Sequence, residues 1–326
     1  MKINKYSIYG LTIGSKTIFP GLHTDSSSKL HDIEIKLNCL QNKQDFLFFN
    51  VQKSISLKAP LQGLEKAEFI ICDDEFKFNI TYNYENSQSK FSFNKKASIV
   101  DICYYPENDY KNTLSLLYHP IMAYIARLHN RICLHANVMN NNGKTVAFIG
   151  SSGSGKSTIS ASLWNKGIPV HADDVAAITE ESGTYQVWPG QPRLRVHLKT
   201  AKSICGSKNE FELVFEENYK NENPKVYLGT LSNHIENKPL PLEVIYIIKP
   251  RRKDIIKPVI RTLNPDEALF LLVSNTSAKE IMTQEDKEKE FRFLAKLAKI
   301  IPVKTIECPD SLELLNETTD YILENI

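Results

Sequence analysis

The sequence lacks the features that mark several specialised protein classes. No stretch reaches the ~18 consecutive apolar residues that a membrane helix needs. Neither charge sign dominates, because 40 basic and 38 acidic residues give a net charge of +2. The whole chain therefore has no overall attraction to nucleic acid or to an anionic membrane. We expect neither as a partner, so a local feature must determine what the protein binds.

Closely spaced cysteine pairs are also absent. The six cysteines include no C-x-x-C spacing, so neither a zinc ribbon nor a redox pair is indicated. A chain of 326 residues can form a core without disulfides. The first residues carry no apolar segment or small-residue cleavage site of a secretory signal. These observations predict reduced cysteines and a cytoplasmic protein, while the oligomeric state stays open and is compatible with a homo-oligomer.

The composition is ordinary, and its pattern divides the chain into two predicted domains. With 42% hydrophobic and 24% charged residues, the sequence is neither disordered nor fibrous. Residues 1–100 carry segments in which apolar and polar residues alternate, as in strands with one solvated face. Such segments lie at 33–37, 76–82 and 91–93. From residue 101 to 326, strand and helix patterns alternate, which is typical of an α/β core. We therefore expect a β-rich domain at 1–100 and an α/β domain at 101–326.

Three helical segments have clear signals. Apolar residues follow helical spacing across 110–130. Asn264 precedes Pro265, as an N-cap precedes the first helical residue, and predicts a mostly helical segment over 264–301. The last residues, 311–326, read as an amphipathic helix.

Residues 150–157 read Gly-Ser-Ser-Gly-Ser-Gly-Lys-Ser and match the phosphate-binding pattern G-x-x-x-x-G-K-[ST], the Walker A motif. An apolar strand is predicted before the motif, at 145–149, and a helix after it, at 158–166. The glycines allow the backbone to wrap an anion, and successive N–H groups can point toward it. The helix N-terminus adds positive potential. The predicted nucleotide contacts are Gly150, Ser151, Ser152, Gly153, Ser154, Gly155, Lys156, Ser157 and Thr158.

Individual side chains of this region have predicted roles. Lys156 is expected to contact the β- and γ-phosphates, and the Ser157 hydroxyl to ligate Mg²⁺. Asp173 and Asp174 follow the short predicted strand 170–172. If that strand runs parallel to the strand before the loop, both end at the same sheet edge. One carboxylate could then hold Mg²⁺ while the other accepts a hydroxyl proton. The alternative is a turn or helix cap.

Two further sets of residues are candidates. His135 lies within a predicted strand, 132–139, where a lone histidine is more often structural than catalytic. His171 competes with it and fits a core position better. Arg193 and Arg195 share one face of a predicted strand and could clamp a phosphate or a substrate carboxylate. The alternative for this pair is a solvated strand face.

The order of these motifs resembles the catalytic domain of HPr kinase/phosphorylase. The resemblance rests on 134–136, 150–157, 166–167 and 171–175. The N-terminal opening, 6–22, and the Leu-His-Ala strand are similar to HPr-kinase-like proteins of lasso-peptide gene clusters, which phosphorylate the C-terminal serine of a precursor peptide. The chain departs from the phosphorylase pattern, because alanine follows the histidine and the glycine-rich, Glu-containing segment is missing. The resemblance therefore implies a kinase.

The resemblance implies a fold and a set of roles. The fold is an α/β P-loop kinase core of the HPr kinase and phosphoenolpyruvate carboxykinase type, with a mainly-β N-terminal domain. Asp173 would be the catalytic base, with His135 near the transferred phosphate. Asp174 and Ser157 would serve Mg²⁺, although spacing does not fix which carboxylate plays which part. Lys156 would hold the phosphates.

These roles lead to a functional expectation. ATP and Mg²⁺ are the implied cofactors, and a peptide or protein with an acceptor serine is the implied partner. The reaction would move the γ-phosphate to that hydroxyl, with residues 1–100 presenting the peptide. Two alternatives share the central motif. They are a kinase of a small hydroxylated metabolite, such as a free amino acid, and a regulatory ATPase.

Overall fold

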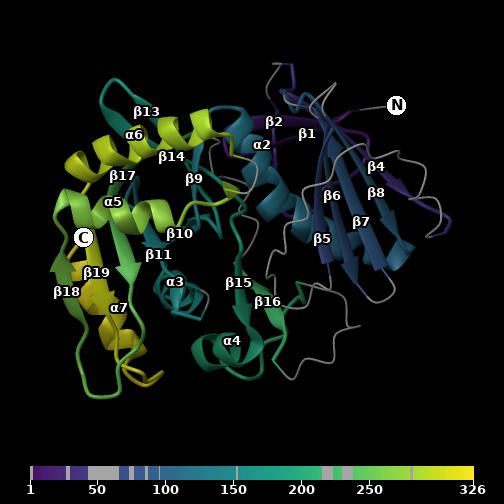
Figure 1. Ribbon diagram of the computed structural model, residues 1–326. Coiled ribbons are helices and arrows are strands. Elements are labelled where there is room, and N and C mark those ends of the chain that lie inside the picture. The colour runs from purple at the N-terminus through teal and green to yellow at the C-terminus, as the bar shows by residue number, and fades with distance from the viewer. Residues whose placement is uncertain are drawn as a thin grey trace. The chain divides into compact units, whose positions relative to one another are not determined.

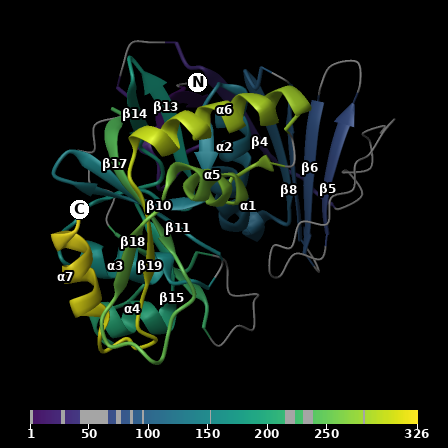
Figure 2. The ribbon, with the colours of Figure 1, turned by 60° about the vertical axis from the view of Figure 1, so that its left-hand side comes forward.

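The computed structural model forms two compact units. Unit 1 comprises Met1–His129, and unit 2 comprises Asn130–Val214 and Lys220–Ile326. The residues that the structure describes are 3–26, 30–42, 66–72, 77–84, 87–94, 96–151, 153–214, 223–229, 238–279 and 282–326. Figures 1 and 2 show the elements of each unit. In the described part of the chain, no helix is both long and apolar enough to cross a membrane.

Unit 1 is built on an eight-stranded sheet in its described residues, with strand order β3-β1-β2-β4-β8-β7-β6-β5. The strands are β1 (Asn4–Ile8), β2 (Leu11–Ser15), β3 (His23–Thr24), β4 (Ile33–Cys39), β5 (Lys66–Cys72), β6 (Lys77–Tyr84), β7 (Ser87–Phe93) and β8 (Ile99–Tyr105). Most pairs are antiparallel, while β4 runs parallel to both β2 and β8. The alternating segments predicted in this region correspond to β4, β6 and β7, and residue 76 lies outside the described residues.

A broken helix completes unit 1. Its parts are the 3₁₀ turn η2 (Glu107–Asp109), α1 (Tyr110–Leu116), the π-helical turn η3 (Leu117–Ile121) and α2 (Met122–Leu128). Pro120 lies inside η3. Proline has no N–H and its ring collides with the preceding turn, which a locally wider turn relieves. The sequence predicted one helix over 110–130, and the proline accounts for the difference.

The helical segment packs against the sheet of unit 1. The Tyr118 hydroxyl donates to the Pro20 carbonyl at 2.9 Å, and the Tyr9 hydroxyl donates to the Tyr118 carbonyl at 3.2 Å. The helical segment therefore belongs to unit 1, which extends to His129. The predicted division at residue 100 followed the change from strand to helix pattern, which does not say against which sheet the helix packs.

Unit 2 contains a nine-stranded mixed sheet and a separate two-stranded hairpin within the described residues. The strands of the large sheet are β9 (Ile132–Leu134), β10 (Ala136–Asn141), β11 (Lys144–Ile149), β12 (Val170–Ala172), β13 (Ala176–Glu181), β14 (Thr184–Trp188), β17 (Leu240–Ile248), β18 (Val259–Thr262) and β19 (Val303–Glu307). The hairpin consists of β15 (Leu194–His197) and β16 (Lys225–Leu228).

The helices of unit 2 are α3 (Lys156–Asn165), α4 (Leu198–Cys205), α5 (Pro265–Ser274), α6 (Gln284–Ile300) and α7 (Leu315–Glu324). The predicted cap is confirmed, because the Asn264 side chain accepts from two N–H groups of the first turn of α5. The loop helix α3 begins at Lys156, two residues before its predicted start at residue 158.

The sheet of unit 2 separates two apolar layers. Alternate residues of β10, β11 and β17 face opposite sides, as the two-residue period of a strand requires. Val138, Ala147 and Ile245 pack with residues of α5 and α6. Val146 and Tyr246 pack on the other face with residues of α3, α4, α7 and the hairpin. Unit 2 is therefore a three-layer α/β arrangement (Figure 1), and the predicted mixed α/β character is observed.

Candidate functional site

The loop between β11 and α3 has the backbone that its glycines predict. Gly153 and Gly155 adopt positive φ angles of +81° and +110°, which other residues adopt with strain. Gly150 is needed for space: a Cβ there would lie 2.6 Å from the Ser154 Oγ and 2.9 Å from the Ile248 carbonyl oxygen. The motif therefore folds as a strand, a tight loop and a helix, in the predicted order.

Lys156 closes over this loop. The residue is only 7% exposed, and its ammonium donates to the carbonyls of Gly150 and Ser151. Burial lowers the pKa of Lys156 to about 8, so the charged form is held in a poorly solvated position. The Ser154 hydroxyl is buried and, among the described residues, has no hydrogen-bond partner. Ser152 lies outside the described residues.

Ser157 and Thr158 complete the predicted loop residues. Both lie in the first turn of α3 and are half-buried. The first N–H groups of a helix have no partner within the helix, and the helix dipole favours an anion beside them. The residues present thus fit a phosphate group: a glycine cradle, a buried ammonium and a helix N-terminus meet at one loop.

Strand register places Asp173 and Asp174, the acid pair, at the edge of the sheet where the glycine loop after β11 begins. Val138 of β10 lies opposite both Ala147 of β11 and Ala172 of β12, in antiparallel pairings. Consequently β11 and β12 run in the same direction on either side of β10. Both end at the same edge, where Gly150 follows β11 and Asp173 follows β12. The direction expected from the sequence is observed, with one strand lying between the two.

Asp173 is buried, at 1% exposure, and extensively hydrogen-bonded. Its Oδ1 accepts from the Asn137 Nδ2 at 3.0 Å. Its Oδ2 accepts from the backbone N–H and the Nε of Arg195, each at 3.2 Å. Burial raises the pKa of Asp173, while the charges of Arg195 and Lys225 act in the opposite direction. A carboxyl with a raised pKa is a better proton acceptor than an ordinary aspartate.

Asp174 occupies a strained and more open position. Its φ is +63°, a region that non-glycine residues rarely adopt. Its carboxylate accepts from the Arg195 Nη2, and its side chain is 26% exposed. Its carbonyl accepts from the Ala136 N–H at 3.2 Å. Non-glycine residues in this conformation cluster at functional sites. In this backbone conformation the carboxylates of Asp173 and Asp174 both contact the Arg195 guanidinium.

His135 lies at the bend between β9 and β10, where the sequence predicted one continuous strand. Its Nδ1 lies 3.2 Å from the Asp174 carbonyl oxygen. Burial, reinforced by the charges of Lys156 and Arg195, lowers the pKa of His135 to about 4. The ring is therefore neutral at pH 7. To donate to that carbonyl it must carry its proton on Nδ1, which leaves Nε2 as an acceptor.

His171, the competing histidine, is buried at 2% exposure. Its Nε2 lies 2.9 Å from the Val187 carbonyl oxygen. This is the core position that the sequence favoured for it.

The two arginines, which the sequence suggested as a clamp for a phosphate or carboxylate, have different protein partners in the structure. Arg195 bridges the two carboxylates of Asp173 and Asp174. Arg193 donates from Nη2 to the Glu212 Oε2 at 2.7 Å, and its guanidinium lies 4.2 Å from the centre of the Tyr227 ring. The side chains share a parity, as predicted, but Arg193 precedes β15 and is held by its own neighbours.

Sequence reasoning missed two members of the site. Asn137 had no distinguishing pattern, because it is one polar residue within an apolar strand. Lys225 lies on β16, far along the chain from the loop, and nothing in its neighbourhood resembles a motif. Its charge nevertheless acts on His135, Lys156 and Asp173. Only strand pairing could have indicated Lys225.

Taken together, the ionisable side chains leave an excess of positive charge. Lys156, Arg195 and Lys225 are cations, whereas Asp173 and Asp174 are the carboxylates. A phosphate-bearing ligand would meet this excess favourably. The described residues contain no group of three or more His, Cys, Asp or Glu side chains able to hold a metal ion.

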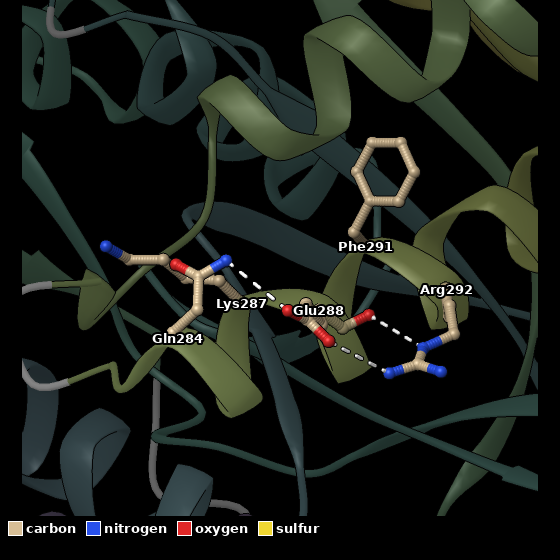
Figure 3. Close-up of a pocket in the computed structure, with 5 residues that line it drawn as sticks. All are labelled: Gln284, Lys287, Glu288, Phe291 and Arg292. Atoms are coloured by element: carbon tan, nitrogen blue, oxygen red, sulfur yellow. Dashed lines mark hydrogen bonds and ion pairs between the residues drawn. The ribbon is translucent and has the colours of Figure 1, made fainter.

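A shallow pocket elsewhere in unit 2 has a different character (Figure 3). Its lining residues are Gln284, Lys287, Glu288, Phe291 and Arg292, all from α6. Glu288 accepts from the side chains of Gln284 and Arg292, one turn away on each side. These are the ordinary pairings of a solvated helix face, and the pocket includes none of the residues above.

Comparisons with known proteins give a limited result. No model of a known protein family matches the chain, and no curated protein matches its sequence. A search of solved structures finds similarity to the Hpr(Ser) kinase/phosphatase from Coxiella burnetii. The match has 14% sequence identity and a TM-score of 0.30, and it covers 59% of this chain and 89% of that one.

Proposed function

We propose that the protein is an ATP- and Mg²⁺-dependent phosphotransferase that moves the γ-phosphoryl group to a serine hydroxyl of a peptide or protein. One observation carries the proposal. The acid pair at the end of β12 and the glycine loop after β11 share a sheet edge, and Asp173 is close enough to Lys156 to influence its pKa. A proton acceptor and a phosphate site are therefore adjacent.

The residues present match what phosphoryl transfer requires. The chemistry needs positioning, positive charge near the developing negative oxygens and an acceptor for the hydroxyl proton. The loop and Lys156 bind the phosphates, and Asp173 takes the proton. A carboxylate offers about four lone-pair sites, of which Asn137 and Arg195 use three. The remaining site is assigned to the acceptor hydroxyl.

Two residues are assigned to the metal. Ser157 in the first turn of α3 and the partly exposed Asp174 would contribute oxygen ligands. When bound, Mg²⁺ neutralises phosphate charge and orients the phosphate chain. Arg195, which contacts both Asp173 and Asp174 in this structure, offsets the repulsion between the two adjacent carboxylates.

The decisive experiment is incubation of the protein with Mg-ATP and a panel of peptides that end in serine, read by intact mass. The expected result is addition of one phosphate to the C-terminal serine, and none to matched peptides that end in alanine. Phosphorylation of free serine at an equal kcat/KM would replace the peptide acceptor with a small metabolite. ADP formation with no phosphorylated acceptor would refute transfer and leave an ATPase.

We assign acceptor recognition to unit 1, because a β-sheet such as the one on which this unit is built can take up an extended peptide as an additional strand. The test uses the full chain and an acceptor peptide with a photoreactive residue near its N-terminus. We expect cross-links in residues 3–129, mapped by mass spectrometry and competed by unlabelled peptide. Cross-links confined to unit 2 would contradict the assignment.

A further inference from the structure

The hairpin β15–β16 has one apolar and one polar face. Leu194 and Val196 of β15 pack into the core with the apolar residues of β16. Because successive side chains alternate, the opposite face carries Arg195 and, on β16, Lys225 and Tyr227. Arg195 lies directly opposite Tyr227, so Lys225 is its diagonal neighbour on the same face.

Lys225 belongs to the same charge cluster as the phosphate loop and the acid pair. Its charge lowers the pKa of Lys156 and acts against the rise that burial causes in the pKa of Asp173. Partial desolvation, reinforced by the charge of Arg195, lowers the pKa of Lys225 itself, although the residue is exposed overall. Lys225 is therefore close enough to Lys156, Arg195 and Asp173 for its charge to interact with theirs.

These cations differ in what they already bind. Arg195 is engaged by two carboxylates, and Lys156 donates to loop carbonyls. Within the described part of the chain, the Lys225 ammonium has no hydrogen-bond or salt-bridge partner, so all three of its donors are available. A lysine ammonium that lies next to a buried charge cluster and has no partner among the described residues is suited to an anion supplied by a ligand.

We propose that Lys225 binds the γ-phosphoryl group during its transfer and thereby distinguishes ATP from ADP. This inference rests on the proposed function. In-line transfer forms a bond from the acceptor oxygen to the γ-phosphorus while the bond from that phosphorus to the ADP oxygen breaks. The hydroxyl proton goes to Asp173, and the electron pair of the broken bond leaves with ADP. The phosphoryl group thus passes between Lys156 and Asp173, where the Lys225 charge acts on both.

The test measures binding as well as turnover. Lys225→Met removes the charge and keeps the length of the side chain, and Lys225→Arg keeps the charge. The matched control is Lys202→Met, an exposed lysine on the adjacent helix α4. Isothermal titration in Mg²⁺ buffer compares a non-hydrolysable ATP analogue with ADP for each variant, and circular dichroism confirms that each variant is folded.

For Lys225→Met we expect the affinity for the ATP analogue to fall about 10-fold and that for ADP to change less than about twofold, because ADP lacks the contacted group. The kcat should fall by roughly 10²-fold, the typical cost of losing one stabilising donor. Lys225→Arg should recover much of the analogue affinity. Lys202→Met should match the wild type in every measurement.

Equal loss of analogue and ADP affinity in Lys225→Met would overturn the inference, since it would mean a general effect on the loop. Wild-type affinity and kcat would overturn it equally. The binding ratio also separates this inference from the proposed function. If the wild type transfers no phosphate to any acceptor, the proposed function fails, while the ratio of analogue to ADP affinity still decides whether Lys225 contacts the γ-phosphate.

Discussion

Two buried aspartates, one in each unit, have contrasting surroundings. Asp109 of unit 1 is 4% exposed and Asp173 of unit 2 is 1% exposed. Two of the groups that donate to Asp109 are neutral, the Asn112 Nδ2 at 2.6 Å and the Ser89 Oγ at 3.3 Å. Asp173 instead accepts from an amide and from the guanidinium of Arg195.

The difference separates a carboxylate whose bonds join neighbouring elements from the one that we propose as the proton acceptor. The bonds of Asp109 join the helix α1 region to β7 and are explained by packing alone. The partners of Asp173 come from β10 and β15, and its charged neighbours extend to α3 and β16. Segments distant in the chain converge there and gather three cations around one buried carboxylate, which packing alone does not explain.

The sharpest test of this contrast replaces each aspartate by asparagine. Asp173→Asn removes the proton acceptor, so phosphotransfer should fall by about 10²-fold or more, with ATP affinity within a few-fold of wild type. Asp109→Asn should keep the wild-type kcat per folded molecule. Steady-state kinetics and nucleotide titration give both quantities. Turnover near that of the wild type in Asp173→Asn would refute its role.

Lys156→Ala tests the other half of the site. Loss of the loop ammonium should weaken ATP binding by about 10-fold or more and also lower kcat, because the charge contacts the phosphates before and during transfer. Lys166→Ala is the control, since that lysine directly follows the same helix and pairs with the exposed Asp320 at 2.6 Å. If both variants bound ATP equally well, the loop would not be the phosphate site.

The parts of the site that follow local rules could be predicted from the sequence. The loop glycines, the helix after them and the cap at Asn264 depend on a few neighbouring residues. The parallel direction of β12, on which the expected position of the two aspartates depended, is observed, because the single helix α3 between β11 and β12 returns the chain to the opposite end of the sheet before β12 begins.

What the sequence could not supply depended on pairing between distant segments. Lys225 lies near the site because β16 pairs with β15. Arg193 does not share the partners of Arg195, because it contacts Glu212 and Tyr227 instead. Neither pairing has a sequence signal. The end of unit 1 at His129, rather than at residue 100, likewise depends on where a helix packs.

Stability measurements should show that the buried Asp109 contributes to the free energy of unfolding. Asp109→Ala deprives the buried Asn112 and Ser89 side chains of an acceptor, so the free energy of unfolding should fall by about 1–3 kcal/mol. Asp101→Ala, an exposed aspartate of β8, should change it by less than about 0.5 kcal/mol. Chemical denaturation followed by fluorescence measures both. Equal effects of the two substitutions would mean that the Asp109 network contributes no more than an ordinary surface residue.

The smallest expected effect separates the two arginines. Arg193→Met removes a stacking contact with Tyr227 and an ion pair with Glu212, whose side chain is 51% exposed. Each contact contributes about 0.5–1 kcal/mol at a solvated site, so thermal unfolding should shift by a few degrees while kcat/KM stays within about twofold of wild type. A loss of kcat/KM of about 10-fold or more would mean that Arg193 reaches the substrate after all, and that the pair acts together as its shared strand face suggested.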